Sequence, residues 1–232
     1  MSDQAEKFVS PPSAALARNG RRTQRERSSL AENALMDAAE SLFAQRGVEQ
    51  TSLADVGREA GYSRGLANHH FGTKAALIER LARRTQTEFV VDEQKHYRGG
   101  DAIEILATLT EDYLTTVGGR GATARAFFVM WGAAFPSEAW LRSVFANDDA
   151  QFRDAVEALL RAGKDRQAVA DDIDPKVGAV VLVGLLRGIA AQYLIDPDGV
   201  DLVAARAAAT DFVRRSFSVR TDALSPKRCS ET

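Results

Sequence analysis

Apolar residues recur three and four positions apart along most of the chain, which is the period of an amphipathic helix. After residue 28, Leu35, Ala38, Leu42 and Phe43 follow this spacing. No stretch alternates between apolar and polar residues as a half-buried strand does. The pattern therefore predicts an all-α protein. After residue 74, one long helix is expected to run to the segment KHYRGG at 95–100. The helices expected after it are 101–117, 123–134, 137–145, 148–163, 174–195 and 199–217.

Capping residues and glycines divide the pattern between residues 28 and 84 into short helices. Ser52 and Asp55 form an S-x-x-D arrangement, in which both side chains satisfy free amides of a first helical turn. Gly57 stands inside that helix although glycine costs about 1 kcal/mol against alanine there, so we expect another backbone to approach it closely. The other boundaries are predicted at Ser28 or Ser29, Gly47, Gly61, Ser63 and Thr73. Two of these helices, joined by the turn 61–63, form a helix-turn-helix unit.

The overall composition is that of a globular protein. The chain has 232 residues, of which 45% are hydrophobic and 27% charged. It has one cysteine, Cys229, so it cannot form a disulfide within itself. The longest apolar run covers ten residues, 177–186, whereas a membrane-spanning helix needs about 20. We expect a soluble, cytoplasmic protein that does not contact a membrane.

Charge is distributed unevenly along the chain. Residues 1–84 carry 13 Lys and Arg against 10 Asp and Glu, whereas residues 85–232 carry 17 against 22. The segment RNGRRTQRER at 18–27 holds five of those arginines and one glutamate. Such a run is either a solvated surface or a contact for a polyanion, and its place directly before a folded unit favours a nucleic-acid contact.

The adjacent histidines His69 and His70 invite a metal or catalytic interpretation that geometry does not support. Neighbours on a helix point about 100° apart, so these two cannot chelate one metal ion as an i, i+4 pair can. His96, the third histidine, belongs to a different predicted helix. The chain also lacks the nucleotide-binding loop, the nucleophile elbow and the Cys/His pair that catalytic sites use. We expect no enzyme activity, no metal and no cofactor.

The helix after the 61–63 turn has the features of a DNA-reading helix. It opens with Ser63, Arg64 and Gly65, although an Arg at a helix start is unfavourable for the helix dipole. Small residues at Gly65 and Ala67 keep its face shallow, which allows close approach to a duplex. The amide of Asn68 offers the donor and acceptor pair that matches adenine.

The segment TSLADVGREAGYSRGLANHHFGTKAAL at 51–77 is similar to the DNA-binding segment of TetR-family transcriptional regulators, and the resemblance covers residues 28 to about 84. It implies that Thr51 and Lys74 contact DNA phosphates, that His69 meets a phosphate, and that His70 and Phe71 pack into a three-helix core. Asn68 stands where the family usually has Tyr, so both a base contact and a phosphate contact remain open for it. Together with the arm, the expected DNA contacts are Arg22, Arg25, Thr51, Ser63, Arg64, Gly65, Leu66, Asn68, His69 and Lys74.

The same resemblance implies a C-terminal helical domain that binds a small molecule and forms a homodimer. Helices 174–195 and 199–217 carry small and apolar residues along one side, which permits close helix packing between two copies, although an internal core explains the same pattern. The residues expected at the dimer interface are Val177, Val181, Gly184, Leu185, Gly188, Gln192, Leu202, Ala209 and Phe212.

Aromatic residues gather between positions 127 and 152, where they either fill a core or line a cavity for a hydrophobic or aromatic effector. The residues expected to line such a cavity are Tyr113, Arg125, Phe127, Met130, Trp131, Phe135 and Trp140.

The expected organisation has four parts. They are a flexible basic arm (1–27), a helix-turn-helix DNA-binding domain (28–74), a helical effector-binding and dimerisation domain (75–218) and a flexible tail (219–232). The resemblance implies a repressor that an effector releases from a palindromic double-stranded DNA operator. Two alternatives remain open: an enzyme or ligand carrier with an incidental helix-turn-helix, and an architectural DNA-binding dimer without a ligand.

Overall fold

The computed structural model describes residues 24–96, 100–136 and 139–219, with side chains given outside 86–96 and residue 139. The described residues are helical apart from turns and one isolated bridge between Val169 and Ser218. This confirms the predicted all-α fold. The helices are α1 (Gln24–Arg46), α2 (Leu53–Glu59), α3 (Leu66–Phe71), α4 (Lys74–His96), α5 (Ala102–Gly119), α6 (Gly121–Ala133), α7 (Ala139–Asp165), α8 (Pro175–Ile195) and α9 (Leu202–Phe217).

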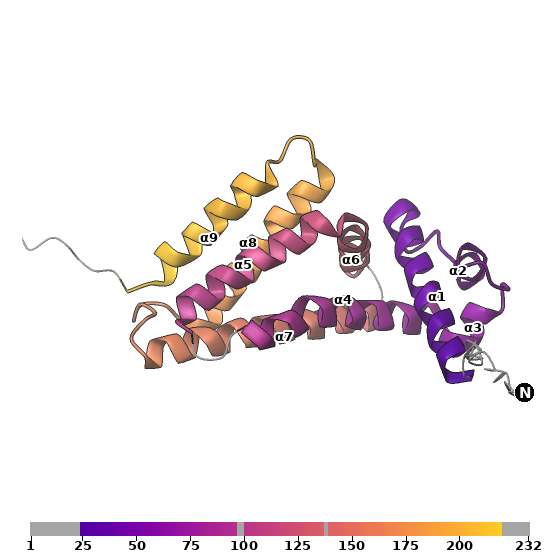
Figure 1. Ribbon diagram of the computed structural model, residues 1–232, viewed down its shortest axis with the longest axis horizontal. Coiled ribbons are helices and arrows are strands. Elements are labelled where there is room, and N and C mark those ends of the chain that lie inside the picture. Colours follow the sequence, from indigo (N-terminus) through magenta and orange to yellow (C-terminus); the bar gives the residue numbers. More distant parts are fainter. Residues whose placement is uncertain (1–23, 97–99, 137–138, 220–232) are drawn as a thin grey trace, which may run out of the picture.

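Helices α1, α2 and α3 form one end of the molecule, and α4 leads from them towards the other helices (Figure 1). The chain turns after α1 and α2 at Gly47 and Gly61, which have φ of 82° and 76°, values that favour glycine. Ser52 and Asp55 form the predicted capping box at the start of α2. Thr73 caps α4 by accepting a hydrogen bond from the amide of Ala76 at 3.1 Å. These boundaries are confirmed.

Two predicted caps were wrong. Helix α1 begins at Gln24, so Ser28 and Ser29 lie inside it and the last four residues of the expected arm are helical. The residues 24–27 are good helix formers, and a serine caps only where the preceding backbone is extended. Ser63 does not cap α3 either, because Gly65 takes the N-cap position without a side-chain hydrogen bond.

Gly57 has the role predicted for it. A Cβ added at this position would lie 2.7 Å from the carbonyl oxygen of Ser63 and 3.4 Å from the Cα of Arg64. Real Cβ atoms essentially never come within 3.0 Å of another heavy atom. The absence of a side chain on α2 therefore lets the turn before α3 pack directly against it, which fixes where the next helix starts.

The first hydrophobic core extends beyond the expected boundary at residue 74. It joins residues of α1, α2 and α3 to Leu77, Ile78 and Leu81 of α4 and to Phe127 and Met130 of α6. Helix α6 packs directly against α1. The helix-turn-helix unit is thus built onto the C-terminal half through a shared core, and no linker separates the two.

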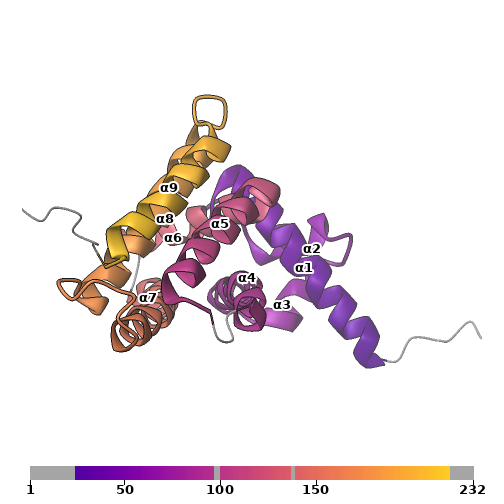
Figure 2. The same cartoon turned by 60° about the vertical axis from the view of Figure 1, so that its left-hand side comes forward.

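The second core lies among α5, α7, α8 and α9, and α9 runs beside α5 and α8 (Figures 1 and 2). Helix α7 is continuous from Ala139 to Asp165, so the two separate helices predicted at 137–145 and 148–163 were wrong. No glycine or proline interrupts residues 145–150, and Asp148 and Asp149 in this stretch face Arg187 of α8.

Helix α8 begins with the predicted Asp174 cap, whose side chain accepts hydrogen bonds from the amides of Lys176 and Val177. By length and composition α8 is apolar enough to cross a membrane, and 44% of its most apolar window is buried inside the protomer. Core helices of soluble proteins have the same character.

Candidate nucleic-acid interface and effector site

Helix α3 presents a polar surface to solvent and an apolar surface to the core. Ser63, Arg64, Gly65, Asn68 and His69 are exposed, as the expected groove contacts require. On the inner face, Ala67 and Phe71 are buried and belong to the first core. Leu66, expected along the groove, is half-buried and packs against this core. The inner face of this six-residue helix therefore packs against the core, and its outer face, together with the turn before it, is open to solvent.

The two histidines divide as expected between the two faces. His69 is exposed and His70 is half-buried next to Phe71, with the rings of His69 and His70 5.9 Å apart and nearly perpendicular. Among the residues that the structure describes, no group of three or more His, Cys, Asp or Glu side chains is placed to hold a metal ion.

A hollow beside α3 is formed where α2 and α4 begin. Its lining includes Ser52, Thr73 and Lys74 and it is open to solvent. Free amides at helix starts favour anions, so this hollow suits a DNA phosphate. Asp55 also lines it, but its carboxylate accepts hydrogen bonds from the side chain and amide of Ser52, which lower its pKa, and it pairs with Arg58.

Two predicted phosphate contacts have internal partners. Thr51 is 1% exposed, and its hydroxyl donates to the carbonyl of Gly47 at 2.9 Å. We therefore assign Thr51 a structural role in place of the expected phosphate contact. Lys74 is half-buried and its Nζ donates to the carbonyl of Val48 at 3.0 Å, at the edge of the hollow.

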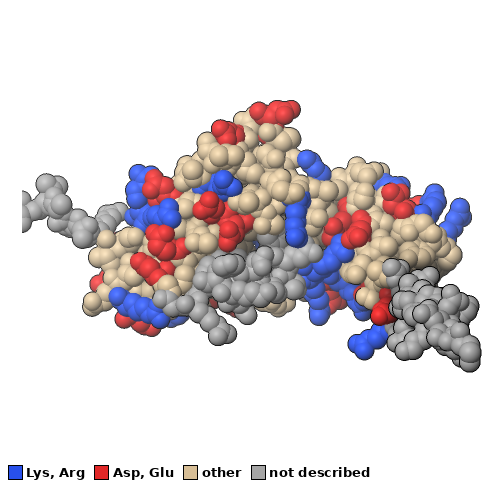
Figure 3. Space-filling model, in the orientation of Figure 1, with Lys and Arg blue, Asp and Glu red and all other residues tan. Residues whose placement is uncertain are grey.

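The expected contacts of the basic arm fall in two places. Arg22 lies outside the described residues, and Arg25 is exposed on the first turn of α1. On the face seen in Figure 3, Lys and Arg atoms are interspersed with Asp and Glu atoms, and a group of basic atoms lies over the part of α4 nearest α1. Arg80 and Arg84 of this part pair with Glu32 and Asp37 of α1.

A polar network connects the helix-turn-helix end to α6. Glu40 of α1 is 9% exposed and pairs with Arg84 of α4 at 2.5 Å. The other oxygen of Glu40 accepts a hydrogen bond from Thr123 of α6 at 3.2 Å. One buried carboxylate of α1 thus contacts side chains of both α4 and α6.

The aromatic residues expected to line a cavity have different positions. Phe127 and Met130 are buried in the first core and Tyr113 in the second, and burial raises the pKa of Tyr113 to about 12. Trp131 is half-buried, whereas Arg125, Phe135 and Trp140 are exposed. None of these seven residues lines the cavity described next, so they do not mark that site.

Sequence reasoning missed a buried ionic cluster at the centre of the C-terminal half. The guanidinium of Arg187, on α8, lies 4.9 Å from the ring centre of Phe127 and 5.3 Å from that of Trp131. Its Nη2 is 2.5 Å from Asp149 Oδ1 and 3.5 Å from Asp148 Oδ2. The available signal was a single Arg inside the apolar sequence of α8, which a protein buries only with a partner.

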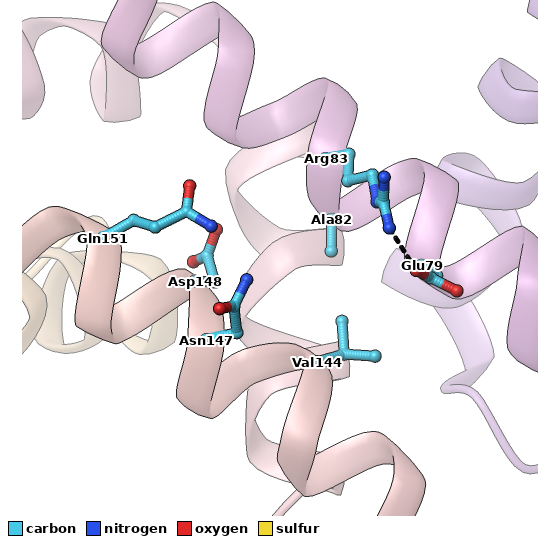
Figure 4. Close-up of a pocket in the computed structure, with 7 residues that line it drawn as sticks. All are labelled: Glu79, Ala82, Arg83, Val144, Asn147, Asp148 and Gln151. Carbon is cyan, nitrogen blue, oxygen red and sulfur yellow. Dashed lines mark hydrogen bonds and ion pairs between the residues drawn. The ribbon is translucent and has the colours of Figure 1, made fainter.

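A cavity of about 360 Å³ lies between α4 and α7 (Figure 4). Its floor on α7 includes Asp148 of the ionic cluster, and the facing side chains of α4 include a Glu79–Arg83 ion pair. The complete lining consists of Glu79, Ala82, Arg83, Val144, Asn147, Asp148 and Gln151.

Helices α8 and α9 carry an apolar surface that the protomer does not cover. Val177, Val181 and Phe212 have exposed fractions of 59%, 50% and 47%. Of the other residues expected at a dimer interface, Gly184, Gly188 and Gln192 are exposed and Leu185 and Leu202 are half-buried. Ala209 is 4% exposed because it packs in the second core. Its predicted place at the dimer interface was therefore wrong. Val180, Ile195 and Val203 are exposed on the same helices and were not anticipated.

Known proteins resemble the chain over both halves. Residues 35–81 match the family "Bacterial regulatory proteins, tetR family", and residues 102–218 match "BetI-type transcriptional repressor, C-terminal". The HTH-type transcriptional regulator AcrR of Shigella flexneri is 24% identical over 173 residues, covering 72% of this chain and 80% of AcrR.

Solved structures show the same fold. The SmeT–triclosan complex superposes with a TM-score of 0.73 at 22% identity, covering 88% of this chain and 98% of SmeT. A transcriptional regulator from Saccharomonospora viridis in complex with choline gives a TM-score of 0.71 at 23% identity, covering 83% of this chain and all of that one. With its exposed recognition helix and the matches over both halves, the chain belongs to the TetR family of DNA-binding transcriptional regulators.

Proposed function

We propose that the protein is a cytoplasmic homodimeric repressor, without enzyme activity, that binds a palindromic operator and leaves it when a small molecule binds. The observation that carries this proposal is the exposed surface formed by Arg64 and Gly65, directly before α3, and by Asn68 and His69 on its outer face, opposite the buried Ala67 and Phe71. A helix held in this way enters a major groove with its first residues at the bases. The hollow at the starts of α2 and α4 then receives a neighbouring phosphate.

The exposed apolar surface of α8 and α9 supports dimerisation. Val177, Val181 and Phe212 would leave large apolar side chains of α8 and α9 in water, and grouped exposed apolar side chains mark protein interfaces. The exposed glycines Gly184 and Gly188 have no atoms near the position of a Cβ, so a second helix can approach closely there. A two-fold contact through this surface gives two recognition helices related by symmetry, which reads an inverted repeat.

The connections between α1, α4 and α6 support release by an effector. Phe127 and Trp131 of α6 stack on Arg187 of α8, and Thr123 of the same helix bonds to Glu40 of α1. A molecule that binds the C-terminal half and shifts α4 or α6 therefore changes the position of α1 and its helix-turn-helix. Ligand and operator then oppose each other, because each favours a different spacing of the two recognition helices. The two solved relatives contain choline and triclosan, and a hydrophobic or aromatic effector stays a prediction for this chain.

A mobility shift in excess polyanionic competitor tests the groove assignment. We expect Arg64→Ala and Asn68→Ala to weaken binding to a specific duplex about tenfold or more, since a good bidentate base contact contributes about 1–3 kcal/mol. Arg161→Ala, which removes an exposed arginine of α7 next to Leu160 of the second core, is the matched control and should bind as the parent does. Parent-like binding by both α3 variants would refute the assignment.

A further inference from the structure

The ionic cluster around Arg187 has one positive charge and two negative ones. Asp149 is held closely, since its Oδ1 lies 2.5 Å from Arg187 Nη2 and its Oδ2 accepts from Trp131 Nε1 at 3.2 Å, although this Oδ1 and the Nε and Nη1 of Arg187 are buried without a hydrogen-bond partner. Asp148 is held less closely, because its Oδ2 is 3.5 Å from Arg187 and its Oδ1 is buried without a hydrogen-bond partner. Both Arg187 and Asp148 are 8% exposed. With one guanidinium against two carboxylates the cluster has one excess negative charge when both are ionised, and Asp148 is the carboxylate that lies farther from Arg187.

Asp148 also lines the cavity between α4 and α7, so a cation that compensates the negative charge of this carboxylate could bind in the cavity. Figure 4 shows Asn147, Asp148 and Gln151 projecting from α7 on the side that faces Ala82 of α4. Val144 and Ala82 are the apolar residues of the lining, and the other side chains are amides or charged groups. An ionised carboxylate in such a buried position is costly unless a hydrogen-bonding partner neutralises it.

The lining also selects the class of cation. The aromatic rings of Phe127 and Trp131, which would favour a quaternary ammonium ion, are covered by Arg187 and do not line the cavity. A divalent metal ion takes six or more oxygen ligands or several carboxylates, and the described residues offer no group of three metal-ligating side chains here. Amide oxygens beside a carboxylate instead suit an ammonium group that carries N–H donors.

We propose that the cavity between α4 and α7 binds a protonated primary or secondary organic amine, whose ammonium group pairs with the carboxylate of Asp148 and donates a hydrogen bond to the amide oxygen of Asn147. The proposal rests on the proposed function in taking this amine as the effector. An amine seated there bridges α4, which carries part of the first core, and α7, which carries Asp148. Binding thus acts on the helix that leads into the helix-turn-helix unit.

A thermal shift on the full-length protein without DNA tests the binding site. The probes are n-butylamine, 1,4-diaminobutane and 2-phenylethylamine, with 1-butanol, butyltrimethylammonium and Mg²⁺ as comparison compounds. We expect at least one amine to raise Tm in a concentration-dependent way, because a ligand that binds only the folded state stabilises it. The comparison compounds should leave Tm unchanged. A silent amine panel, or an equal response to butyltrimethylammonium or Mg²⁺, would overturn the proposal.

Two variants and a control locate the site. Asp148→Asn should weaken amine binding at least tenfold, whereas Asp154→Asn, at an exposed position of the same helix, should bind as the parent does. Val144→Lys places a tethered ammonium one turn before Asp148 on the same face, so it should raise Tm and abolish the amine response even if Asp148→Asn folds poorly. An unchanged amine response in Val144→Lys would contradict the site.

DNA binding is measured separately, by mobility shift of the parent and of Asp148→Asn without amine. The thermal shift is carried out without DNA and the mobility shift without amine, so the two results are independent. A protein that binds no amine can still bind the operator, and a protein that binds no operator can still bind the amine. Addition of the amine to the parent–operator complex then tests the effector role. We expect release of the parent from DNA and no release of Asp148→Asn.

Discussion

The close packing of α2 against the turn before α3 makes Gly57→Ala a sharp test of how the recognition helix is positioned. The new Cβ would lie 2.7 Å from the carbonyl oxygen of Ser63, and that neighbour is backbone, so the turn itself must move by several tenths of an ångström. Overpacking of this kind costs about 1–3 kcal/mol. Alanine in a helix interior stabilises the folded protein by about 0.5–1 kcal/mol relative to glycine, which offsets part of this cost.

The same substitution at Gly132, in α6, isolates the steric cost. Nothing lies within 4 Å of a Cβ at Gly132, so Gly132→Ala should gain the helical preference alone. The difference between the two variants is then the overpacking cost, about 1–3 kcal/mol. For a chain of this size each kcal/mol shifts Tm by about 2–4 °C.

The assays are urea unfolding followed by circular dichroism, at one protein concentration, and a mobility shift on specific duplex. Gly57→Ala should unfold at lower urea than Gly132→Ala and should bind duplex more weakly, because Ser63 and Arg64 have moved. Equal stability of the two variants, together with parent-like DNA binding by Gly57→Ala, would refute the account of the turn.

The other predictions concern the dimer surface, the ionic cluster and the polar network. Val181→Glu, at an exposed apolar position of α8, should give monomers in size-exclusion chromatography with light scattering and weaken operator binding, and a stable dimer would contradict the interface. Burial raises the pKa of Asp148 from 3.8 to about 6, although Arg187 opposes the shift and Asp149 adds to it. The folded state therefore holds this proton more tightly than the unfolded state, and the resulting stability is present below pH 4 and lost as pH rises through 6. Asp148→Asn should abolish this loss, up to about 3 kcal/mol in unfolding free energy, and an unchanged pH profile would contradict it. Arg84→Ala leaves Glu40 buried without its ion pair and should cost about 1–3 kcal/mol in urea unfolding, against less than about 1 kcal/mol for the exposed pair removed by Arg161→Ala. Equal costs for these two variants would contradict the network.

The sequence was informative where local chemistry decides the structure. Ser52 with Asp55, Gly47, Gly61 and Asp174 mark real helix boundaries, because a cap or a positive φ depends on residues a few positions away. Gly57 was interpretable for the same reason, since a glycine inside a helix needs a compensating contact.

Features that depend on distant residues could not be predicted from the sequence. Ser28 has the right chemistry for a cap, but whether it caps depends on the backbone before it, which continues as helix. The helix α7 was predicted as two helices, and the partner of its Asp148 and Asp149, Arg187, lies 38 or more positions away in the sequence. Thr51 is a plausible phosphate contact by residue type, yet its hydroxyl is turned inward to Gly47.

The candidate effector site shows the same division. Aromatic residues of α6 and α7 suggested a cavity, but hydrophobicity alone does not distinguish a core from a pocket, and Phe127 and Met130 are core. The cavity found between α4 and α7 is built from residues 79–83 and 144–151, a pairing that only the packing of the two helices reveals.

The central claim is that two copies of this chain read an inverted repeat with α3. Selection of bound sites from a random duplex library by the full-length protein tests it most directly. We expect enrichment of one sequence made of two inverted half-sites, with centres about one helical turn of DNA, or a multiple of it, apart. Recovery of no common sequence, or of a single half-site without its inverted partner, would contradict it.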